Sequence, residues 1–336
     1  MKKFLIILVM SVFLGENVMA ENLTKEQQAI AEVAAYAALG NQSGLKQALN
    51  NGLDNGVTVN MFKEILVQSY AYCGFPRSLN ALATLMQTVE ERGNKDELGK
   101  VPSAKPQGES LTYGTENQTK LVGSEVKGKL FEFAPAIDEY LKAHLFGDIF
   151  ARDNVDWKTR ELATIAMLAA RDGVDSQLKA HIDIGKHNGL IDEEVAEILN
   201  IASEAKAKNV VFGFGKLNPN GKYFTGKSYL QPITTTNGVP MFNVTFEPKC
   251  RNNWHIHHKG GQILLVTAGR GWYQEWGKPA QELHVGDVVN IPPETKHWHG
   301  AAKDSWFTHI AVEVPSEGGS NEWLEPVNDE EYNKLK

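Results

Sequence analysis

The sequence has few cysteines, no excess of positive charge and no long apolar stretch beyond its first 20 residues. Of its 336 residues only Cys73 and Cys250 are cysteines, and they lie in different expected domains, so we predict two free thiols rather than a disulfide. The formal net charge is −7, with no basic cluster, which argues against a nucleic-acid partner. Without a later apolar run, we expect no membrane insertion.

The first 20 residues differ from the rest. Lys2 and Lys3 precede an apolar run over residues 4–14, and the small residue Ala20 ends a stretch typical of a cleavage site. The run is too short and wrongly flanked for a membrane span, so it predicts a secretory signal peptide. We therefore expect a bacterial periplasmic or secreted protein, after cleavage near Ala20.

Two contrasting patterns follow this segment. Residues 21–215 are rich in Ala, Leu, Glu and Lys with helical periodicity, whereas residues 220–333 alternate apolar and polar residues and contain frequent Gly and Pro. Seven of the ten histidines and six of the seven tryptophans fall within residues 254–323. The chain is thus predicted to be a multi-domain α + β protein, with an all-α helical bundle followed by an antiparallel β-barrel.

The helical part contains an internal repeat. Residues 45–66 and 178–199 share Leu-Lys, Gly, Asn-Gly and Glu-Ile-Leu at identical spacing. Asn-Gly after a helical stretch is a C-cap signal, so each copy predicts a helix, a stop and a second helix. We expect a first repeat over residues 21–95, a Gly-, Ser-, Thr- and Pro-rich linker over residues 96–127, and a second repeat over residues 128–215.

Two short motifs give this repeat a family resemblance. They are Tyr70-Ala-Tyr-Cys-Gly-Phe-Pro76 and Arg160-Glu-Leu-Ala-Thr-Ile165, the latter followed by Leu178-Lys-Ala-His181. The duplicated pattern resembles the carboxymuconolactone decarboxylase family, which includes alkylhydroperoxidase-like disulfide reductases. The resemblance implies all-α bundles that self-associate, so we expect a homo-oligomer formed through the helical domain, with a trimer of two-copy chains as the expected form.

The chemistry of that family has only partial support in these residues. The redox branch uses a Cys-x-x-Cys pair, but Pro76 follows Cys73 at the second cysteine position. His181 and Glu64 are further catalytic candidates, each with a structural alternative, and we expect Arg160-Glu161 on a solvated or salt-bridged helix face. We therefore expect a structural and oligomerising role, with decarboxylase or peroxidase activity as the alternatives.

The β-rich part carries a histidine pattern that predicts a metal site. It reads His255-x-His257-x4-Gln262, followed later by Pro292-x4-His297. His255 and His257 are two residues apart on an expected strand, so their side chains leave the same face. Three imidazoles and one amide oxygen suit a single divalent transition metal and leave positions open for a ligand.

This pattern resembles the two-part signature of the cupin superfamily, a small jelly-roll barrel. Cupins usually have Glu where Gln262 stands and Gly where Glu294 stands. The amide removes one negative charge from the ligand set, which makes a bound metal a stronger Lewis acid. Residues 262–272 and 296–301 resemble small manganese-binding bacterial cupins, some of which are hydroxynitrile lyases. Manganese is therefore the expected metal, with Fe, Ni and Zn as alternatives.

The resemblance also implies catalytic residues. His299 and His309 align with residues that line the lyase pocket, where either could move a proton. Glu313 replaces a Gln of the lyase pattern, which puts the same substrate preference in doubt. We expect a metal-dependent enzyme acting on a small carbonyl- or hydroxyl-bearing substrate, with cyanohydrin cleavage as the sharpest version. A dioxygenase using Fe and a non-catalytic binder of small molecules remain open.

Overall fold

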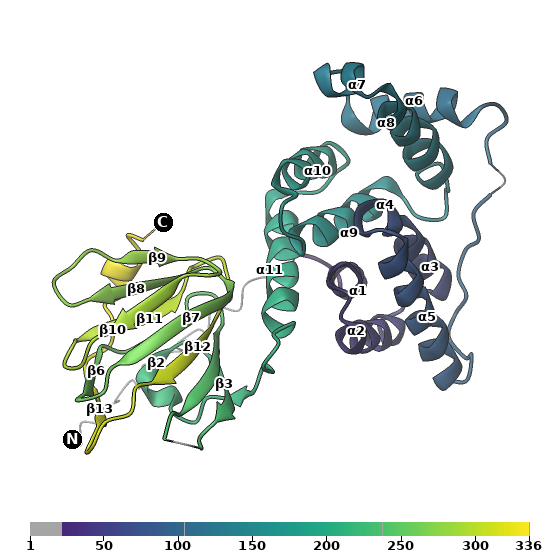
Figure 1. Cartoon of the computed structure of the whole chain (residues 1–336). Helices are drawn as coiled ribbons and strands as arrows, with labels where there is room; N and C mark the ends of the chain where they lie inside the picture. Colours follow the sequence, from purple (N-terminus) through teal and green to yellow (C-terminus); the bar gives the residue numbers. More distant parts are fainter. Residues whose placement is uncertain (1–21, 104, 237, 336) are drawn as a thin grey trace, which may run out of the picture.

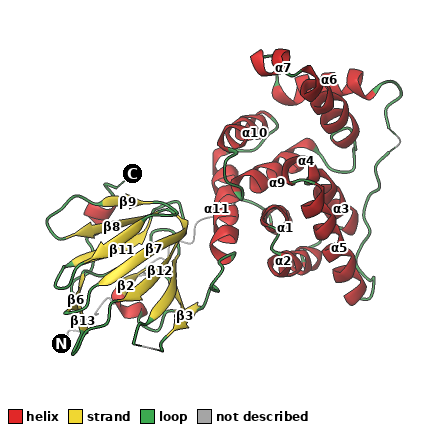
Figure 2. Cartoon of the chain, viewed as in Figure 1, coloured by secondary structure: helices red, strands yellow, loops and turns green. Residues whose placement is uncertain are grey.

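The computed structural model describes residues 22–103, 105–236 and 238–335. Within these ranges helices occupy the first part and strands the second, with α11 (Asp192–Lys208) between them (Figure 1 and Figure 2). The predicted fold class is confirmed. No helix in the described ranges is long and apolar enough to cross a membrane. The expected signal peptide lies outside the described residues.

The internal repeat corresponds to two sets of three helices. In both sets the middle helix ends at an asparagine cap, Asn55 or Asn188, followed by a glycine with a φ of 94° or 99°. This confirms the predicted Asn-Gly stops. The elements of the helical part are, in chain order, α1 (Lys25–Leu39), α2 (Gln42–Asp54), α3 (Val59–Gln68), α4 (Tyr70–Cys73), α5 (Phe75–Glu91), α6 (Ser110–Val122), α7 (Lys129–Phe133), α8 (Pro135–Tyr140), the π-helix η1 (Leu141–Ile149), α9 (Trp157–Ala169), α10 (Asp175–His187) and α11.

Helix α1 lies inside the bundle, in contact with α2, α9 and α11. A capping box closes its N-terminus. The Thr24 hydroxyl accepts from the Gln27 backbone N–H, and the Gln27 side-chain oxygen accepts from the Thr24 backbone N–H. Small side chains allow helices to approach closely. The fully or almost fully buried alanines of α1 are Ala29, Ala31, Ala34, Ala35, Ala37 and Ala38.

The structure differs from the expected linker over residues 96–127, because α6 forms inside it. This helix packs against η1 through two glycines: a Cβ at Gly114 would lie 1.9 Å from the Lys142 carbonyl oxygen, and one at Gly147 would lie 2.5 Å from the Ser110 carbonyl oxygen. Gln118 and Leu121 are buried on the same face of the helix. The Gly content that suggested a linker instead permits close helix packing.

The β-rich part consists of two antiparallel sheets. The first has the strand order β1-β3-β4-β12-β7-β10, and the second β13-β6-β11-β5-β2, with β8 and β9 attached through β11. The elements are β1 (Lys216–Leu217), η2 (Gly221–Tyr223), β2 (Phe224–Thr225), β3 (Ser228–Thr234), β4 (Met241–Phe246), β5 (Arg251–Asn252), β6 (His255–His258), β7 (Gln262–Gly269), β8 (Gly271–Glu275), β9 (Gln281–Leu283), β10 (Val288–Ile291), β11 (His297–Ala301), β12 (Phe307–Glu313), β13 (Ser320–Trp323) and α12 (Asp329–Tyr332).

The two parts meet along α11, which runs beside β7 (Figure 1). The Trp306 backbone N–H donates to the Ser203 hydroxyl at 3.4 Å, and the Asn243 amide donates to the Gly213 carbonyl at 2.9 Å. These contacts lie on the outer surface of the first sheet. The opposite surface of that sheet is left to face the second sheet and to form the site described below.

Candidate metal centre

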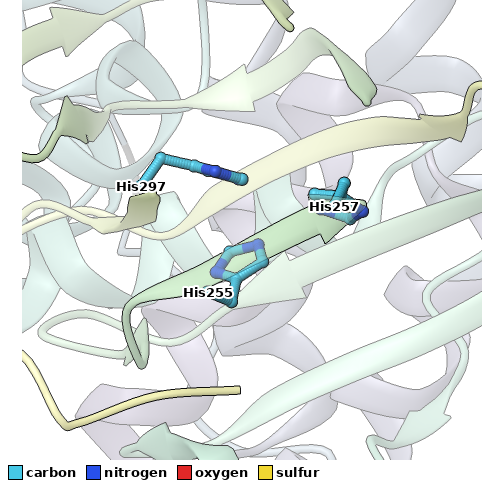
Figure 3. A group of neighbouring side chains, drawn as sticks. All are labelled: His255, His257 and His297. Carbon is cyan, nitrogen blue, oxygen red and sulfur yellow. The ribbon is translucent and has the colours of Figure 1, made fainter. Parts of the chain in front are cut away.

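The three candidate histidine ligands converge from two neighbouring strands. His255 and His257 leave the same face of β6, and His297 pairs with His255 across the β6–β11 ladder. All three are buried, and one ligand nitrogen from each lies within 4.8 Å of the others (Figure 3). The period-two geometry of strands thus brings together the residues that the sequence predicts.

Backbone carbonyls fix the orientation of two of these imidazoles. His255 Nδ1 lies 3.0 Å from the Asn253 oxygen, and His297 Nδ1 lies 2.9 Å from the Thr295 oxygen. A carbonyl only accepts, so in both rings Nδ1 carries the proton and Nε2 presents a lone pair. Among the described residues, the buried His297 Nε2 has no hydrogen-bond partner.

Burial keeps these histidines neutral. Desolvation, together with the nearby imidazoles, lowers the pKa of His255 well below its ordinary value. Desolvation also lowers the pKa of His297 to about 4, although the Thr295 carbonyl opposes the shift. Metal binding requires neutral imidazole, so both rings are in the ligating form at neutral pH.

Gln262 and Glu313 complete the polar surroundings of the triad. They face each other directly across β7 and β12, and the Gln262 amide donates to Glu313 Oε1 at 2.7 Å. Glu313 Oε2 lies 3.1 Å from His257 Nδ1. Burial alone would raise the pKa of Glu313, but its contacts with His257 and Gln262 outweigh burial and lower it.

His299 and His309 are buried in the same barrel interior, with ring centroids 4.9 Å apart. The Asn252 side-chain nitrogen lies 3.1 Å from His299 Nε2, and the Asn252 side-chain oxygen accepts from the His299 backbone N–H. Within the described residues, neither ring nitrogen of His309 has a partner. Burial lowers the pKa of His309 to about 3, and burial with the neighbouring imidazoles lowers that of His299 well below its ordinary value.

A cavity of about 240 Å³ is lined by all of these histidines except His297 and by Gln262 and Glu313. Sequence reasoning missed two of its polar and aromatic walls, Asn252 and Trp323. Trp323 stacks on His255 with ring centroids 4.8 Å apart, and its position in the histidine- and tryptophan-rich segment was the available signal. The residues that line the cavity are Asn218, Asn220, Phe224, Leu230, Phe242, Val244, Phe246, Asn252, His255, His257, Gln262, His299, His309, Ala311, Glu313, Asn321 and Trp323.

Glu294 explains one departure from the cupin pattern. Its φ of 63° lies in the left-handed region that favours glycine. The Glu294 carboxylate accepts from the Lys259 backbone N–H at 2.9 Å and contacts the His258 ring. These contacts hold the Pro292–Glu294 turn against the end of β6. They stabilise a left-handed backbone conformation at Glu294 that glycine would adopt without strain.

The helical candidates lie in the helical bundle and are not among the residues that line the cupin cavity. Glu64 accepts hydrogen bonds from Arg152 at 2.7 and 2.8 Å and forms an ion pair with Arg160 at 3.3 Å. These contacts are typical of a residue that stabilises the fold. Of the two alternatives expected for Arg160-Glu161, the solvated face is wrong, because both residues are fully buried, and the salt-bridged one holds, because Arg160 pairs with Glu64 and Glu161 with His181. Helix α9 carries them inside the bundle, where α1, α10 and α11 contact it.

His181 and Cys73 have different surroundings. His181 Nδ1 lies 2.7 Å from Glu161 Oε2, and the His181 ring meets Tyr72 edge-on at 5.4 Å. Cys73 and Cys250 are both free thiols, as the sequence predicts. Burial raises the pKa of Cys73 despite the nearby Arg171 and Arg77. This thiol is therefore in the less reactive protonated form at neutral pH.

The fold and the histidine centre define a cupin domain, and the family comparisons agree. The cupin domain model matches residues 242–312, and the carboxymuconolactone decarboxylase family model matches residues 7–86 and 135–212. The chain therefore belongs to the cupin family and carries two copies of a carboxymuconolactone decarboxylase family domain before its cupin domain.

Individual relatives give a finer comparison. The chain is 38% identical over 141 residues to a protein of Granulicella tundricola named (R)-mandelonitrile lyase, a match that covers 41% of this chain and 99% of that protein. A cupin-like protein of Thermotoga maritima has 43% identity and a TM-score of 0.36, covering 38% of this chain and 96% of that one. A cupin 2 conserved barrel protein of Salinispora arenicola has 25% identity and a TM-score of 0.25, covering 26% and 76%.

Proposed function

We propose that this chain is a metal-dependent lyase that cleaves a bond next to the oxygen-bearing carbon of a small substrate, with cyanohydrin cleavage as the specific reaction. The observation that carries the proposal is one small cavity lined by two histidines of the triad, His255 and His257, and by two further buried histidines, His299 and His309. The similarity to a protein named (R)-mandelonitrile lyase supports it.

The donor atoms fit a divalent transition metal. His257 Nε2, His297 Nε2 and Gln262 Oε1 are buried without a hydrogen-bond partner among the described residues, as expected of atoms that await a ligand. We propose manganese on the resemblance to manganese-binding cupins, with Fe, Ni and Zn, which imidazole ligands also suit, as alternatives. When bound, the metal would act as a Lewis acid that acidifies a substrate hydroxyl.

His309 and His299 would move the proton. Burial lowers the pKa of both, so at pH 7 each is neutral and has a lone pair for the hydroxyl proton, although the same shift makes it a weaker base than a solvated imidazole; the proton moves as the carbon–cyanide bond breaks and the carbonyl forms. Cyanide leaves with the bonding electron pair. An imidazolium with so low a pKa gives up its proton readily, so it would protonate the departing cyanide and return to the neutral state.

The walls of the cavity indicate the class of substrate. Phe224, Phe242, Phe246 and Trp323 surround the histidines with apolar surface, and the volume of about 240 Å³ admits only a small molecule. Aromatic walls favour a ring-bearing or otherwise apolar group. We therefore propose small apolar aldehydes and their cyanohydrins as the first compounds to examine.

The first experiment is elemental analysis of the untagged protein beside a His255→Ala/His297→Ala variant. We expect about one Mn or Fe per wild-type chain and loss of that metal in the variant. Release of benzaldehyde from mandelonitrile by the wild type, but not by the variant, would then test the reaction. Absence of stoichiometric metal after reconstitution would contradict the proposal, and a ligand that raises the Tm but is recovered unchanged would favour a binding protein.

A second candidate function in the helical part rests on the buried Glu161–His181 pair. Glu161 is fully buried, and its Oε1 has no partner among the described residues while Oε2 contacts His181. A carboxylate-oriented imidazole suits acid–base chemistry such as decarboxylation. Release of carbon dioxide from a carboxylactone by the wild type, abolished in a Glu161→Gln variant that keeps its fold, would support it.

Location and assembly complete the proposal. We propose secretion to the periplasm through the signal peptide and self-association through the helical part. Exposed apolar side chains on α7 and α8 support self-association, since such surface is typical of interfaces: Leu130, Phe133, Ile137 and Tyr140. A monomer by light scattering would contradict the assembly, and an unprocessed N-terminus in a bacterial host would contradict the location.

A further inference from the structure

Glu313 determines which way the Gln262 amide faces. The two residues are direct neighbours across β12 and β7, and the amide nitrogen donates to Glu313 Oε1 at 2.7 Å. A carboxylate can only accept, so the opposite orientation of the amide would place two oxygens against each other. The Gln262 carbonyl oxygen is therefore the free end of the side chain, and it is buried without a partner among the described residues.

The same carboxylate also contacts a histidine of the triad. Glu313 Oε2 lies 3.1 Å from His257 Nδ1. In His255 and His297 the equivalent nitrogen faces a backbone carbonyl at 3.0 and 2.9 Å. Glu313 thus lies beside the His257 nitrogen that corresponds to the ones bonded to the main chain in the other two rings, but as an ion-pair contact, since His257 Nδ1 makes no hydrogen bond among the described residues. Its two oxygens serve two different candidate ligands at once.

Glu313 also supplies negative charge from within the cavity, whereas the other carboxylate that acts on His297, Glu275, is not among the residues that line it. The candidate ligands are three neutral imidazoles and one neutral amide, which leave the charge of a divalent ion uncompensated. Among the described residues that line the inner cavity, Glu313 is the only acidic one. Its place at the end of β12, opposite the start of β7, is fixed by the strand register rather than by a flexible loop.

We infer that Glu313 is a positioning residue of the metal centre, which turns the Gln262 carbonyl and the His257 Nε2 toward the ion and supplies the negative charge that the ligands lack. The inference rests on the metal-binding part of the proposed function. Partners of this kind orient ligands and raise their basicity, and their loss typically weakens metal binding by about 10- to 100-fold.

The test is a Mn²⁺ titration of the chelator-treated, full-length protein, followed by the electron paramagnetic resonance signal of free Mn²⁺. Glu313→Gln keeps the shape of the side chain and removes its charge, so we expect Mn²⁺ affinity to fall by about 10- to 100-fold. Glu317→Gln is the matched control, because it removes the same charge from an exposed position nearby on the chain. Circular dichroism melting verifies that each variant folds.

A double-variant cycle separates positioning from independent action. If Glu313 acts through the Gln262 amide, the double variant Gln262→Ala/Glu313→Gln will lose much less Mn²⁺ affinity than the product of the fold-losses of the two single variants. Swapping the charge with Gln262→Glu/Glu313→Gln should restore affinity relative to Glu313→Gln, because a carboxylate then stands in the ligand position itself. These two results together would support the inference.

Two results would overturn it. Wild-type affinity in Glu313→Gln would remove any role for the carboxylate. Loss of binding in Glu313→Gln with full binding in Gln262→Ala would make Glu313 a ligand rather than a positioning residue. Failure of the wild-type protein itself to bind Mn²⁺, Fe²⁺, Ni²⁺ or Zn²⁺ would overturn the proposed function as well, which distinguishes that outcome from the other two.

Discussion

The helical and cupin parts each contain a buried polar cluster, and the two clusters are built in opposite ways. In the helical part, Arg160 donates to Gln68 at 3.0 Å, to the Arg152 carbonyl at 2.9 Å and to Glu64 at 3.3 Å. Opposite charges are matched inside the protein, although Arg160 Nε and the neighbouring Glu161 Oε1 have no partner among the described residues. In the cupin part, Nδ1 of His255 and Nδ1 of His297 are hydrogen-bonded to backbone carbonyls. The candidate metal-ligand atoms that converge on the interior, such as His297 Nε2, have no hydrogen-bond partner among the described residues.

This difference separates a structural cluster from a binding site. A buried polar atom without a partner costs free energy, so a protein retains several that converge on one point only where a ligand satisfies them. A matched ion pair needs no ligand, and its removal affects folding instead. Changes in the cupin cluster should therefore alter metal content and activity, whereas changes in the Glu64–Arg160 cluster should alter stability.

The largest expected effect is on activity. His309→Ala should lower kcat for cyanohydrin cleavage by about 10²- to 10⁴-fold, the usual contribution of a general acid–base group, while metal content stays at the wild-type level. Benzaldehyde release and elemental analysis on the same sample measure both. His284→Ala, at an exposed histidine of the same domain, is the control. An unchanged kcat in His309→Ala would mean that His299 transfers the proton. It would also weaken the distinction between a structural helical cluster and a reactive cupin cluster.

The next effect is on folding. Glu64→Ala leaves Arg160 buried without its charge partner and should lower the free energy of unfolding by about 3–5 kcal/mol. Glu197→Ala, at the same position of the second repeat, should cost only about 1 kcal/mol, because Glu197 accepts from the Asn22 and Leu23 amides near the surface. Urea unfolding of both variants measures this difference, and equal losses would contradict it.

These two glutamates also mark the limit of prediction from the sequence. The repeat predicts the backbone well: α10 begins and ends 133 residues after α2, and both end at Asn-Gly. It does not predict chemistry, since Glu64 and Glu197 occupy equivalent positions yet bind arginines in one copy and the amides of Asn22, Leu23 and Gln28 in the other. The partners come from segments distant in the sequence, which a local pattern does not specify.

The cupin site was more accessible to prediction because its residues are close in sequence and on strands. The spacing of His255, His257 and His297 is enough to bring them together through period-two geometry and one strand pairing. Asn252 was missed although it lies three residues before His255, because asparagine is common in loops without any functional role, and Trp323 was missed because it lies far from the motif in the sequence. Helix α6 inside the expected linker was not predicted, because glycine serves both loops and close helix packing, as at Gly114.

The third prediction separates the two parts by pH. The pKa values of His255, His297, His299 and His309 are lowered in the folded state, so these groups cost no stability above about pH 6.5. As the pH falls below that value, these histidines bind protons in the unfolded chain but not in the folded chain. This difference persists until the pH reaches the lowered pKa of the folded state, about 4 for His297 and about 3 for His309. Each such histidine then costs about 1.4 kcal/mol per pH unit.

The helical part should resist acid longer. The pKa of Glu64 is lowered because its two arginines outweigh burial, so its stabilising contribution is lost only as the pH falls below the ordinary range of a glutamate. Six of the seven tryptophans lie in the cupin part, so tryptophan fluorescence follows that part and far-UV circular dichroism follows the helices. In metal-free protein the fluorescence transition should come at the higher pH, and coincident transitions would contradict the comparison.

The smallest expected effect concerns the one thiol that the family resemblance made a candidate. Cys73→Ser should leave peroxide consumption unchanged, because burial raises the pKa of Cys73 and disfavours the thiolate that would attack peroxide. A resolving partner is also lacking: Pro76 stands where a second cysteine would be, and Cys250, the other cysteine of the sequence, is a free buried thiol of the cupin part. Cys250→Ser is the control for nonspecific thiol oxidation. Loss of peroxide consumption in Cys73→Ser alone would assign redox chemistry to the helical part, and the division into a structural and a reactive part would no longer hold.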